Sequence, residues 1–209
     1  MPVKKNLKKI FNKFWFLLWK DESFKGWFFS IIFIFIFIKF IFFPGLSLIT
    51  GTPLPLAIVE SCSMYHDGNL LSSTNKWFEK HEEKYSTFDI KKETFKEFSF
   101  EKGMNKGDIL FVVGVNSNNL EIGDVIIFNA NQKNPIIHRI IEIKTERGEK
   151  TFSTIGDNNN GQLSFEQDIK SSEILGRPVL KIAPYLGWIK LLFFEGSKSP
   201  QERGFCDEN

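Results

Sequence analysis

One stretch of the chain, Trp27 to Ile49, restricts the possible folds more than any other. It contains 23 residues, and Lys39 is its only charged side chain. As a helix it would be about 34 Å long at 1.5 Å per residue, and the hydrocarbon core of a bilayer is about 30 Å thick. A strand would leave its backbone amides unpaired in lipid, so the stretch predicts a transmembrane helix. The long apolar core and its exit through Pro44 and Gly45 indicate a retained anchor rather than a cleaved signal peptide.

The residues before this helix carry a signal for its orientation. The lysines there outnumber the acidic residues: Lys4, Lys5, Lys8, Lys9, Lys13, Lys20 and Lys25 against Asp21 and Glu22. Positive residues are enriched on the cytoplasmic side of a membrane helix. We therefore expect a cytoplasmic basic segment over residues 1–26, a single-pass anchor over 27–49 and an extracytoplasmic domain over 50–209.

The part after the anchor is predicted to form a mostly antiparallel β domain. Short segments rich in Ile and Val alternate with turn clusters such as NSNN and GDNNNG. The segments are Ile109–Val115, Asp124–Asn129, Pro135–Lys144, Lys150–Ile155 and Ile174–Ile182. Residues 75–102 are instead dense in charge with spaced aromatic residues, which predicts a small helical insertion covering one edge of the sheet.

Composition excludes several classes of function. There are 27 Lys and Arg residues against 25 Asp and Glu residues, a net charge of +2, so the chain has no broad basic field for nucleic acid. Its two cysteines, Cys62 and Cys206, permit at most one disulfide and lack the spacing of a zinc site. We expect no metal ion and no cofactor.

A candidate nucleophile lies about a dozen residues beyond the anchor, in Ser61–Met64. A serine needs a base within hydrogen-bond reach, and the chain has three histidines. His81 lies in a charged stretch, and His66 is too near Ser63 in sequence to face it productively. His138 lies in PIIHRII, a predicted strand in which its imidazole has apolar neighbours, so it is either the base or a structural histidine.

The third candidate is a carboxylate. Asp157 follows Gly156 at the end of the strand after that of His138, where it could orient the imidazole and stabilise its charged form. Taken alone, GDNNNG is simply a turn. Glu166 and Asp168 come later and would need the intervening loop to fold over the site.

Seven features in order along the chain match one known family. They are the basic N-terminus with its anchor, Ser61–Met64, Gly107–Ile109, Gly123–Ile126, Pro135–Ile140, Thr154–Asn159 and Ile182–Trp188. The chain resembles signal peptidase I of the archaeal and endoplasmic-reticulum type, the membrane-anchored serine endopeptidases that remove signal peptides. Bacterial relatives have a lysine where His138 stands, which favours the archaeal and reticulum branch.

The resemblance implies a role for each candidate residue. Ser63 is then the nucleophile, His138 the general base and acid, and Asp157 the carboxylate that orients the imidazole. The backbone N–H of Ser63 and the hydroxyl of Ser61 would form the oxyanion hole.

The sequence departs from the family pattern at two points. Cys62 occupies the place of the usual small residue between the two serines, and a thiolate there would be an alternative nucleophile. The second acidic residue that the family has soon after GDNN is missing, so Asp168 stays open as an alternative carboxylate.

The same resemblance implies the function, partners and location. We expect cleavage of signal peptides by acyl-enzyme chemistry, with signal-peptide-bearing preproteins and membrane lipid as partners, at the cell membrane if the source is archaeal. The substrate would add as a β-strand beside Ile58, Val59 and the strand beginning at Ile109. Two alternatives remain: a non-catalytic membrane-tethered β module that binds secreted polypeptides, and a regulatory or self-processing serine protease of the same clan. The oligomeric state is left open.

Overall fold

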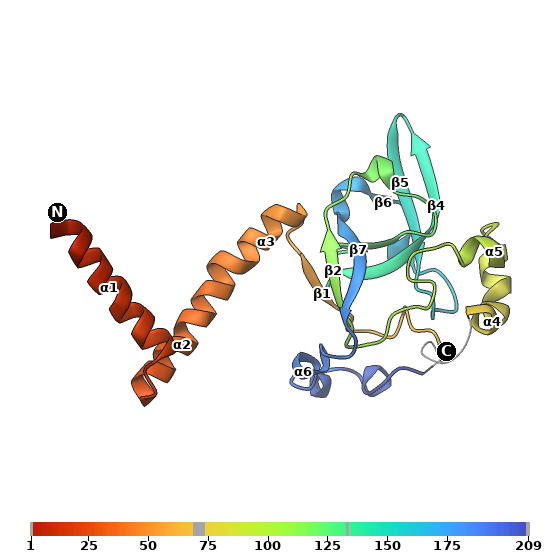
Figure 1. Cartoon of the computed structure of the whole chain (residues 1–209). Coiled ribbons are helices and arrows are strands. Elements are labelled where there is room, and N and C mark those ends of the chain that lie inside the picture. The colour runs from red at the N-terminus through yellow and green to blue at the C-terminus, as the bar shows by residue number, and fades with distance from the viewer. Residues whose placement is uncertain (1, 69–73, 133, 208–209) are drawn as a thin grey trace. The chain divides into compact units, whose positions relative to one another are not determined.

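A computed structural model describes residues 2–68, 74–132 and 134–207. The chain divides into two compact units, with the boundary between Ile49 and Thr50. The first unit is helical and the second is built on a β-sheet (Figure 1).

The first unit is a helical hairpin. Its first helix is α1 (Pro2–Trp19), and Ser23 caps the next one, α2 (Phe24–Phe37), by accepting a hydrogen bond from the Gly26 N–H. Two edge-to-face contacts join the helices, from Phe14 to Phe29 and to Phe33, with ring centroids 5.8 and 5.2 Å apart. Aromatic packing therefore holds the basic helix against the start of the apolar one.

The apolar helix runs without a break from Phe24 to Thr50, 27 residues that are long and apolar enough to cross a membrane. It consists of α2, a π-helical turn η1 (Ile38–Phe42) and α3 (Phe43–Thr50). In the π turn the Phe43 N–H donates to the Ile38 carbonyl, five residues back. Pro44 follows directly and explains the wider turn, because its ring cannot fit against a regular preceding helical turn. The predicted anchor is thus helical and continues through Pro44.

The second unit contains a seven-stranded sheet with the order β1-β2-β7-β3-β4-β5-β6, in which every neighbouring pair is antiparallel. The strands are β1 (Leu56–Ile58), β2 (Ile109–Val113), β3 (Val125–Phe128), β4 (Ile136–Glu146), β5 (Glu149–Ile155), β6 (Ile169–Lys170) and β7 (Ile174–Ala183). Strand β7 pairs with β3 at its start and with β2 further on, which joins the two halves of the sheet. The expected mostly antiparallel β domain is confirmed.

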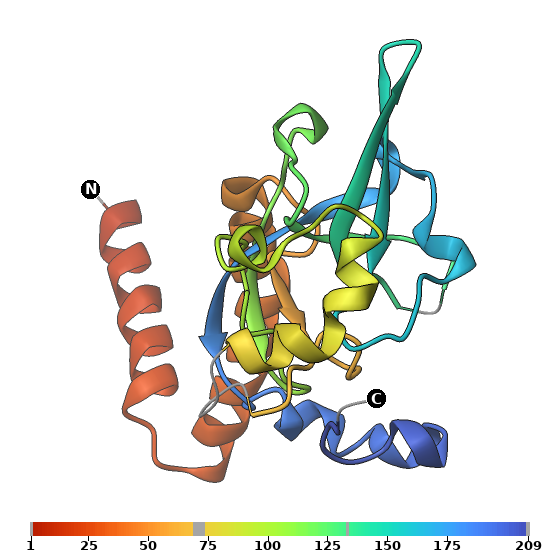
Figure 2. The ribbon, with the colours of Figure 1, turned by 90° about the vertical axis from the view of Figure 1, so that its right-hand side faces the viewer.

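The expected helical insertion is also present, as α4 (Thr74–Ser86) and α5 (Lys92–Phe95). Buried aromatic side chains of these helices form one hydrophobic cluster with Ile141 of β4 and Ile155 of β5. Strands β4 and β5 lie inside the strand order, so the insertion covers the face of inner strands rather than an edge of the sheet. Figure 2 shows the two helices lying across this part of the sheet.

The chain ends in a segment of short helical turns. They are α6 (Trp188–Leu191), η5 (Glu195–Ser197) and η6 (Pro200–Glu202); three more such turns, η2 (Ser117–Asn119), η3 (Ser164–Glu166) and η4 (Ser171–Glu173), connect strands. In α6 the Leu191 side chain is buried, whereas Ile189 is exposed.

Candidate active site

The loop that carries Ser63 begins where β1 ends. Two backbone hydrogen bonds fix its start against the turn before β2: Val59 N–H donates to the Asp108 carbonyl (3.0 Å), and Gly107 N–H donates to the Val59 carbonyl (2.8 Å). The hydroxyl oxygens of Ser61 and Ser63 lie 3.1 Å apart. The structure therefore brings together the two serines that the sequence analysis singled out.

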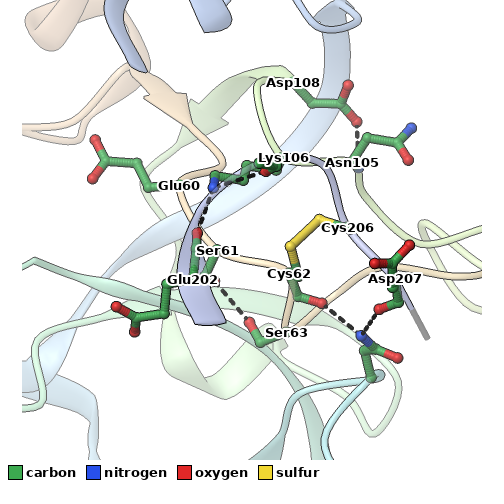
Figure 3. Close-up of a disulfide and its surroundings, with 12 residues drawn as sticks. Glu60, Ser61, Cys62, Ser63, Asn105, Lys106, Asp108, Glu202, Cys206 and Asp207 are labelled. Carbon is green, nitrogen blue, oxygen red and sulfur yellow. Dashed lines mark hydrogen bonds between the residues drawn. A yellow bond between two sulfur atoms is a disulfide. The ribbon is translucent and has the colours of Figure 1, made fainter. Parts of the chain in front are cut away.

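A disulfide flanks the candidate nucleophile. Cys62 is bonded to Cys206, which lies 144 positions later in the chain (Figure 3). A sulfur atom held in a disulfide is not available as a thiolate, so Cys62 cannot be the nucleophile in this form of the protein.

His138 lies on β4, opposite the end of β5. Arg139 pairs with Ile155, so the preceding His138 faces Gly156 across the ladder. A Cβ atom at Gly156 would lie only 2.9 Å from His138 Nε2, so glycine leaves the space that this imidazole edge occupies. The other ring nitrogen, Nδ1, contacts the Glu166 carboxylate, and both side chains are buried.

Glu166 is held by the loop that carries it. This loop includes η3, and the Leu163 N–H donates to Glu166 Oε2 at 2.5 Å. The Gln162 amide donates to the Glu166 carbonyl (3.2 Å) and to the Thr154 carbonyl of β5 (3.0 Å). The loop is thereby tied to the strand whose end faces His138, which places the carboxylate at the imidazole.

Asp157 belongs to a different buried network. Its Oδ1 accepts hydrogen bonds from Arg139 Nε (2.9 Å) and the Tyr85 hydroxyl (2.8 Å). Its Oδ2 accepts one from Arg139 Nη2 (2.7 Å) and lies 2.9 Å from His66 Nε2. Burial alone would raise the pKa of Asp157, but Arg139 and His66 hold that pKa well below its usual range. Asp157 is therefore an anion compensated by a buried guanidinium.

The expected contact between Asp157 and His138 is not found in the residues that the structure describes. Among the described residues no hydrogen bond joins the two, and Glu166 occupies the place at Nδ1. The physical reason is the position of Arg139. It is next to His138 in sequence, but its side chain points to the opposite face of β4, and there it binds the Asp157 carboxylate. Asp168 lies on the surface with its side chain 69% exposed, 3.7 Å from Lys144.

The other two histidines lie in the helical insertion and beneath it. His66 is buried, and its ring stacks on Trp77 with centroids 3.5 Å apart. Burial lowers the pKa of His66. His81 also stacks on Trp77, with ring centroids 4.2 Å apart. Both rings therefore belong to the packing of the insertion.

Ser63 and His138 approach the same turn, residues 156–158. The Asn158 N–H donates to the Ser63 carbonyl at 2.8 Å, and Gly156 abuts His138 Nε2. No hydrogen bond between Ser63 and His138 is found in the described part of the chain. The loop of Ser63 and the imidazole of His138 thus lie at one turn, and the imidazole contacts the carboxylate of Glu166. Acyl transfer needs a serine, an imidazole and a carboxylate of this kind.

Lys84 of α4 supports that turn and was not foreseen from the sequence. Its Nζ donates to the carbonyls of Asp157 (2.5 Å) and Asn159 (3.0 Å). Burial lowers the pKa of Lys84 to about 8, although Asp157 opposes the shift. A charged lysine in a charge-dense helix carries no sequence signal for such a contact.

Comparison with known proteins gives a consistent set of relatives. The chain is 25% identical over 163 residues to a signal peptidase complex catalytic subunit from Colletotrichum graminicola, which covers 75% of this chain and 73% of that protein. It is 36% identical over 105 residues to the subunit of the same name from Saccharomyces cerevisiae (strain YJM789). The chain is therefore similar to catalytic subunits of the signal peptidase complex, in agreement with the resemblance that its motifs carry. The yeast match covers 46% of this chain and 62% of the relative. No family model matches the chain.

Proposed function

We propose that this chain is a membrane-anchored serine endopeptidase that cleaves signal peptides from exported preproteins. One observation carries the proposal: a serine loop and a buried histidine–carboxylate pair meet at residues 156–158, in a homologue of signal peptidase catalytic subunits. No metal ion or cofactor is required by this chemistry.

In the proposed mechanism Ser63 attacks the carbonyl at the cleavage site. His138 takes the serine proton at Nε2 and returns it to the leaving amine, and water then hydrolyses the acyl-enzyme. The Ser63 N–H and the Ser61 hydroxyl stabilise the oxyanion. Removing one such donor typically costs about 3 kcal/mol of transition-state stabilisation.

We propose Glu166 as the group that orients His138. Its contact with Nδ1 keeps the proton on that nitrogen, so that Nε2 is free to act as the base, and it stabilises the imidazolium that forms. Asp157 is proposed to act without contacting His138, by holding the turn in place through its contacts with Arg139 and His66. Asp168 is too exposed to orient a buried imidazole.

The substrate is proposed to bind along β1. This strand is at one edge of the sheet and leads directly to the serine loop, so a peptide added at the edge would pass the nucleophile. Backbone hydrogen bonds would supply general affinity, and shallow apolar pockets near Ile58 and Val59 would select small side chains next to the scissile bond.

We propose that residues 27–49 cross the membrane, residues 1–26 stay in the cytoplasm and residues 50–209 act on the extracytoplasmic side. The apolar helix and the lysines before it support this topology. The disulfide between Cys62 and Cys206 also supports it, since disulfides persist in oxidising compartments.

The test is cleavage of a purified preprotein by the full chain in detergent. A signal peptide with Ala one and three residues before the scissile bond should be cut by the wild type but not by Ser63→Ala, and one with Leu or Phe at either position should resist. Binding without cleavage by the wild type would instead indicate the non-catalytic module. Cleavage restricted to the chain itself would indicate a self-processing protease.

A further inference from the structure

The loop that carries Ser61 and Ser63 has little regular structure of its own. Strand β1 ends at Ile58, and among the described residues the next helix or strand is α4, whose bounds are Thr74–Ser86. Within the loop, the Ser63 carbonyl accepts from Asn158 and the Met64 carbonyl accepts from the Met104 N–H at 2.7 Å. Ser61 is exposed. The backbone that carries the nucleophile therefore depends on neighbouring segments for its position.

Residues 195–207, which we call the C-terminal clamp, supply that support. Cys206 is bonded to Cys62, directly before the nucleophile, and Lys198 Nζ donates to the Glu60 carbonyl at 2.7 Å. Figure 3 shows the disulfide between the serine loop and the clamp. The clamp thus contacts the loop at two positions, one covalent and one polar.

Asn158 joins the clamp to the loop that carries Ser63 and to the turn of residues 156–158. Its side-chain amide donates to the Cys62 carbonyl (3.2 Å) and to the Asp207 carbonyl (3.1 Å). Its backbone N–H donates to the Ser63 carbonyl. A movement of the clamp at Asp207 would therefore reach the nucleophile and the turn beside His138 together.

The clamp is itself anchored to the β domain without the disulfide. The buried Lys106 donates from Nζ to Glu195 Oε2 (2.8 Å) and to the carbonyls of Glu202 (2.6 Å) and Gly204 (3.0 Å). Burial raises the pKa of Glu195, but hydrogen bonds from Lys106 and the Gly204 N–H lower it to about 2. A tether to an anchored segment can fix the loop, whereas a tether to a loose tail would not.

We propose that Cys206, through its disulfide with Cys62, is a positioning residue for Ser63, and that the enzyme reaches its full rate only with this pair oxidised. The proposal rests on the proposed function for its kinetic consequence. A displacement of about 1 Å at a reacting group can cost about 100-fold in rate, and active sites hold their groups to within about 0.5 Å. Loss of the covalent support directly before Ser63 should therefore lower kcat more than it changes KM.

The first arm of the test is kinetic. A dithiol such as dithiothreitol supplies two electrons and two protons, converts the disulfide to two thiols and itself becomes a cyclic disulfide. Reduction should lower kcat for preprotein cleavage by about 10-fold or more with a smaller change in KM, and reoxidation should restore it. Cys206→Ala should be slow from the start and insensitive to the reductant.

A matched control separates positioning from loss of stability. Leu120 is buried in a hydrophobic cluster with residues of β3, β4 and β5, and no described residue of the loop or the clamp belongs to that cluster. Leu120→Ala should therefore lower the melting temperature without lowering kcat. All rates are measured well below the melting temperature of the reduced protein. An unchanged kcat after reduction, with both thiols labelled, would overturn the proposal.

The second arm does not depend on catalysis. Amide hydrogen exchange on the full chain should become faster on reduction in residues 60–65 and stay unchanged in β4 and β5. If the oxidised wild type cleaves no preprotein but exchange responds in this way, the proposed function fails and the positioning role stands. If exchange in residues 60–65 does not respond, the positioning role fails whatever the activity.

Discussion

Two buried pairs of a histidine and a carboxylate are found among the described residues, and they differ in what surrounds them. His66 contacts Asp157, whose charge is compensated by Arg139 and whose Oδ1 also accepts from Tyr85. His138 contacts Glu166. The first imidazole is stacked flat against Trp77, whereas Nε2 of the second faces a glycine beside the serine loop.

The comparison teaches that a buried pair by itself says little about function. In the pair of His66, the guanidinium of Arg139 already compensates the Asp157 carboxylate, so this carboxylate stabilises a protonated imidazole only weakly. Burial therefore lowers the pKa of His66. In the pair of His138 one nitrogen contacts the carboxylate, and the other lies beside Gly156 with no hydrogen-bond partner found among the described residues. A general base needs a ring nitrogen that can accept a proton.

The largest expected difference between the pairs is at the imidazoles themselves. His138→Ala should lower kcat by about 10⁴-fold or more, because the Ser63 hydroxyl is no longer activated without the base. His66→Ala should instead lower the melting temperature and keep most of the activity of the folded protein. Cleavage rates and thermal melts of both purified variants measure this, and an inactive but fully folded His66 variant would reverse the two roles.

The carboxylate of the catalytic pair should have the next largest effect. Glu166→Gln keeps the shape of the side chain but removes its charge, and we expect kcat to fall by about 10³- to 10⁴-fold with little change in melting temperature. The comparison variant is Asp168→Asn, on the surface, which should stay within about 10-fold of the wild type. A greater loss in Asp168→Asn would place the orienting carboxylate there.

Asp157→Asn should act mainly on stability. It removes the negative charge that Arg139 requires in a fully buried place, and breaking such a pair typically costs about 3–5 kcal/mol. Denaturant unfolding measures the loss. Below the melting temperature, kcat should fall less than in Glu166→Gln; a larger fall in kcat in folded Asp157→Asn would make Asp157 the group that orients His138.

The smallest expected effect is a dependence of stability on pH. Both His66 and Asp157 have a folded-state pKa below the unfolded value, so the unfolded chain binds more protons and stability falls as pH falls. The loss should begin below about pH 6.5 through His66 and deepen below about pH 4 through Asp157. His66→Gln should remove the first step from melting curves recorded between these values. An unchanged first step would assign it to another group.

The sequence predicted the parts of this molecule that repeat a local pattern. The apolar helix and five strands follow from hydrophobic runs bounded by turn residues, and all five strands are present within a few residues of the expected bounds. Strands β1 and β6 were missed because they are three and two residues long. Segments of that length have no periodicity of their own and exist only through their partners.

Ser61, Ser63 and His138 could be singled out because each lies in a recognisable motif, and their roles stay predictions until activity is measured. The sequence predicts Asp157 as the partner of His138, with Asp168 as the alternative, whereas Glu166 makes the contact. That contact depends on how the loop of residues 161–168 folds back through Gln162. The pairing of Arg139 with Asp157 could not be predicted from the sequence for a similar reason. A residue beside the histidine in sequence points to the other face of the strand, and only the insertion that covers this face gives the arginine a buried place.

The bond between residues 62 and 206 also sets an order of events during synthesis. A ribosome makes residue 62 early, and 144 further positions must follow before its partner exists. The loop with Ser63 therefore emerges long before the clamp that contacts it. Until residue 206 has been made and bonded to residue 62, the loop with Ser63 lacks the support of the clamp.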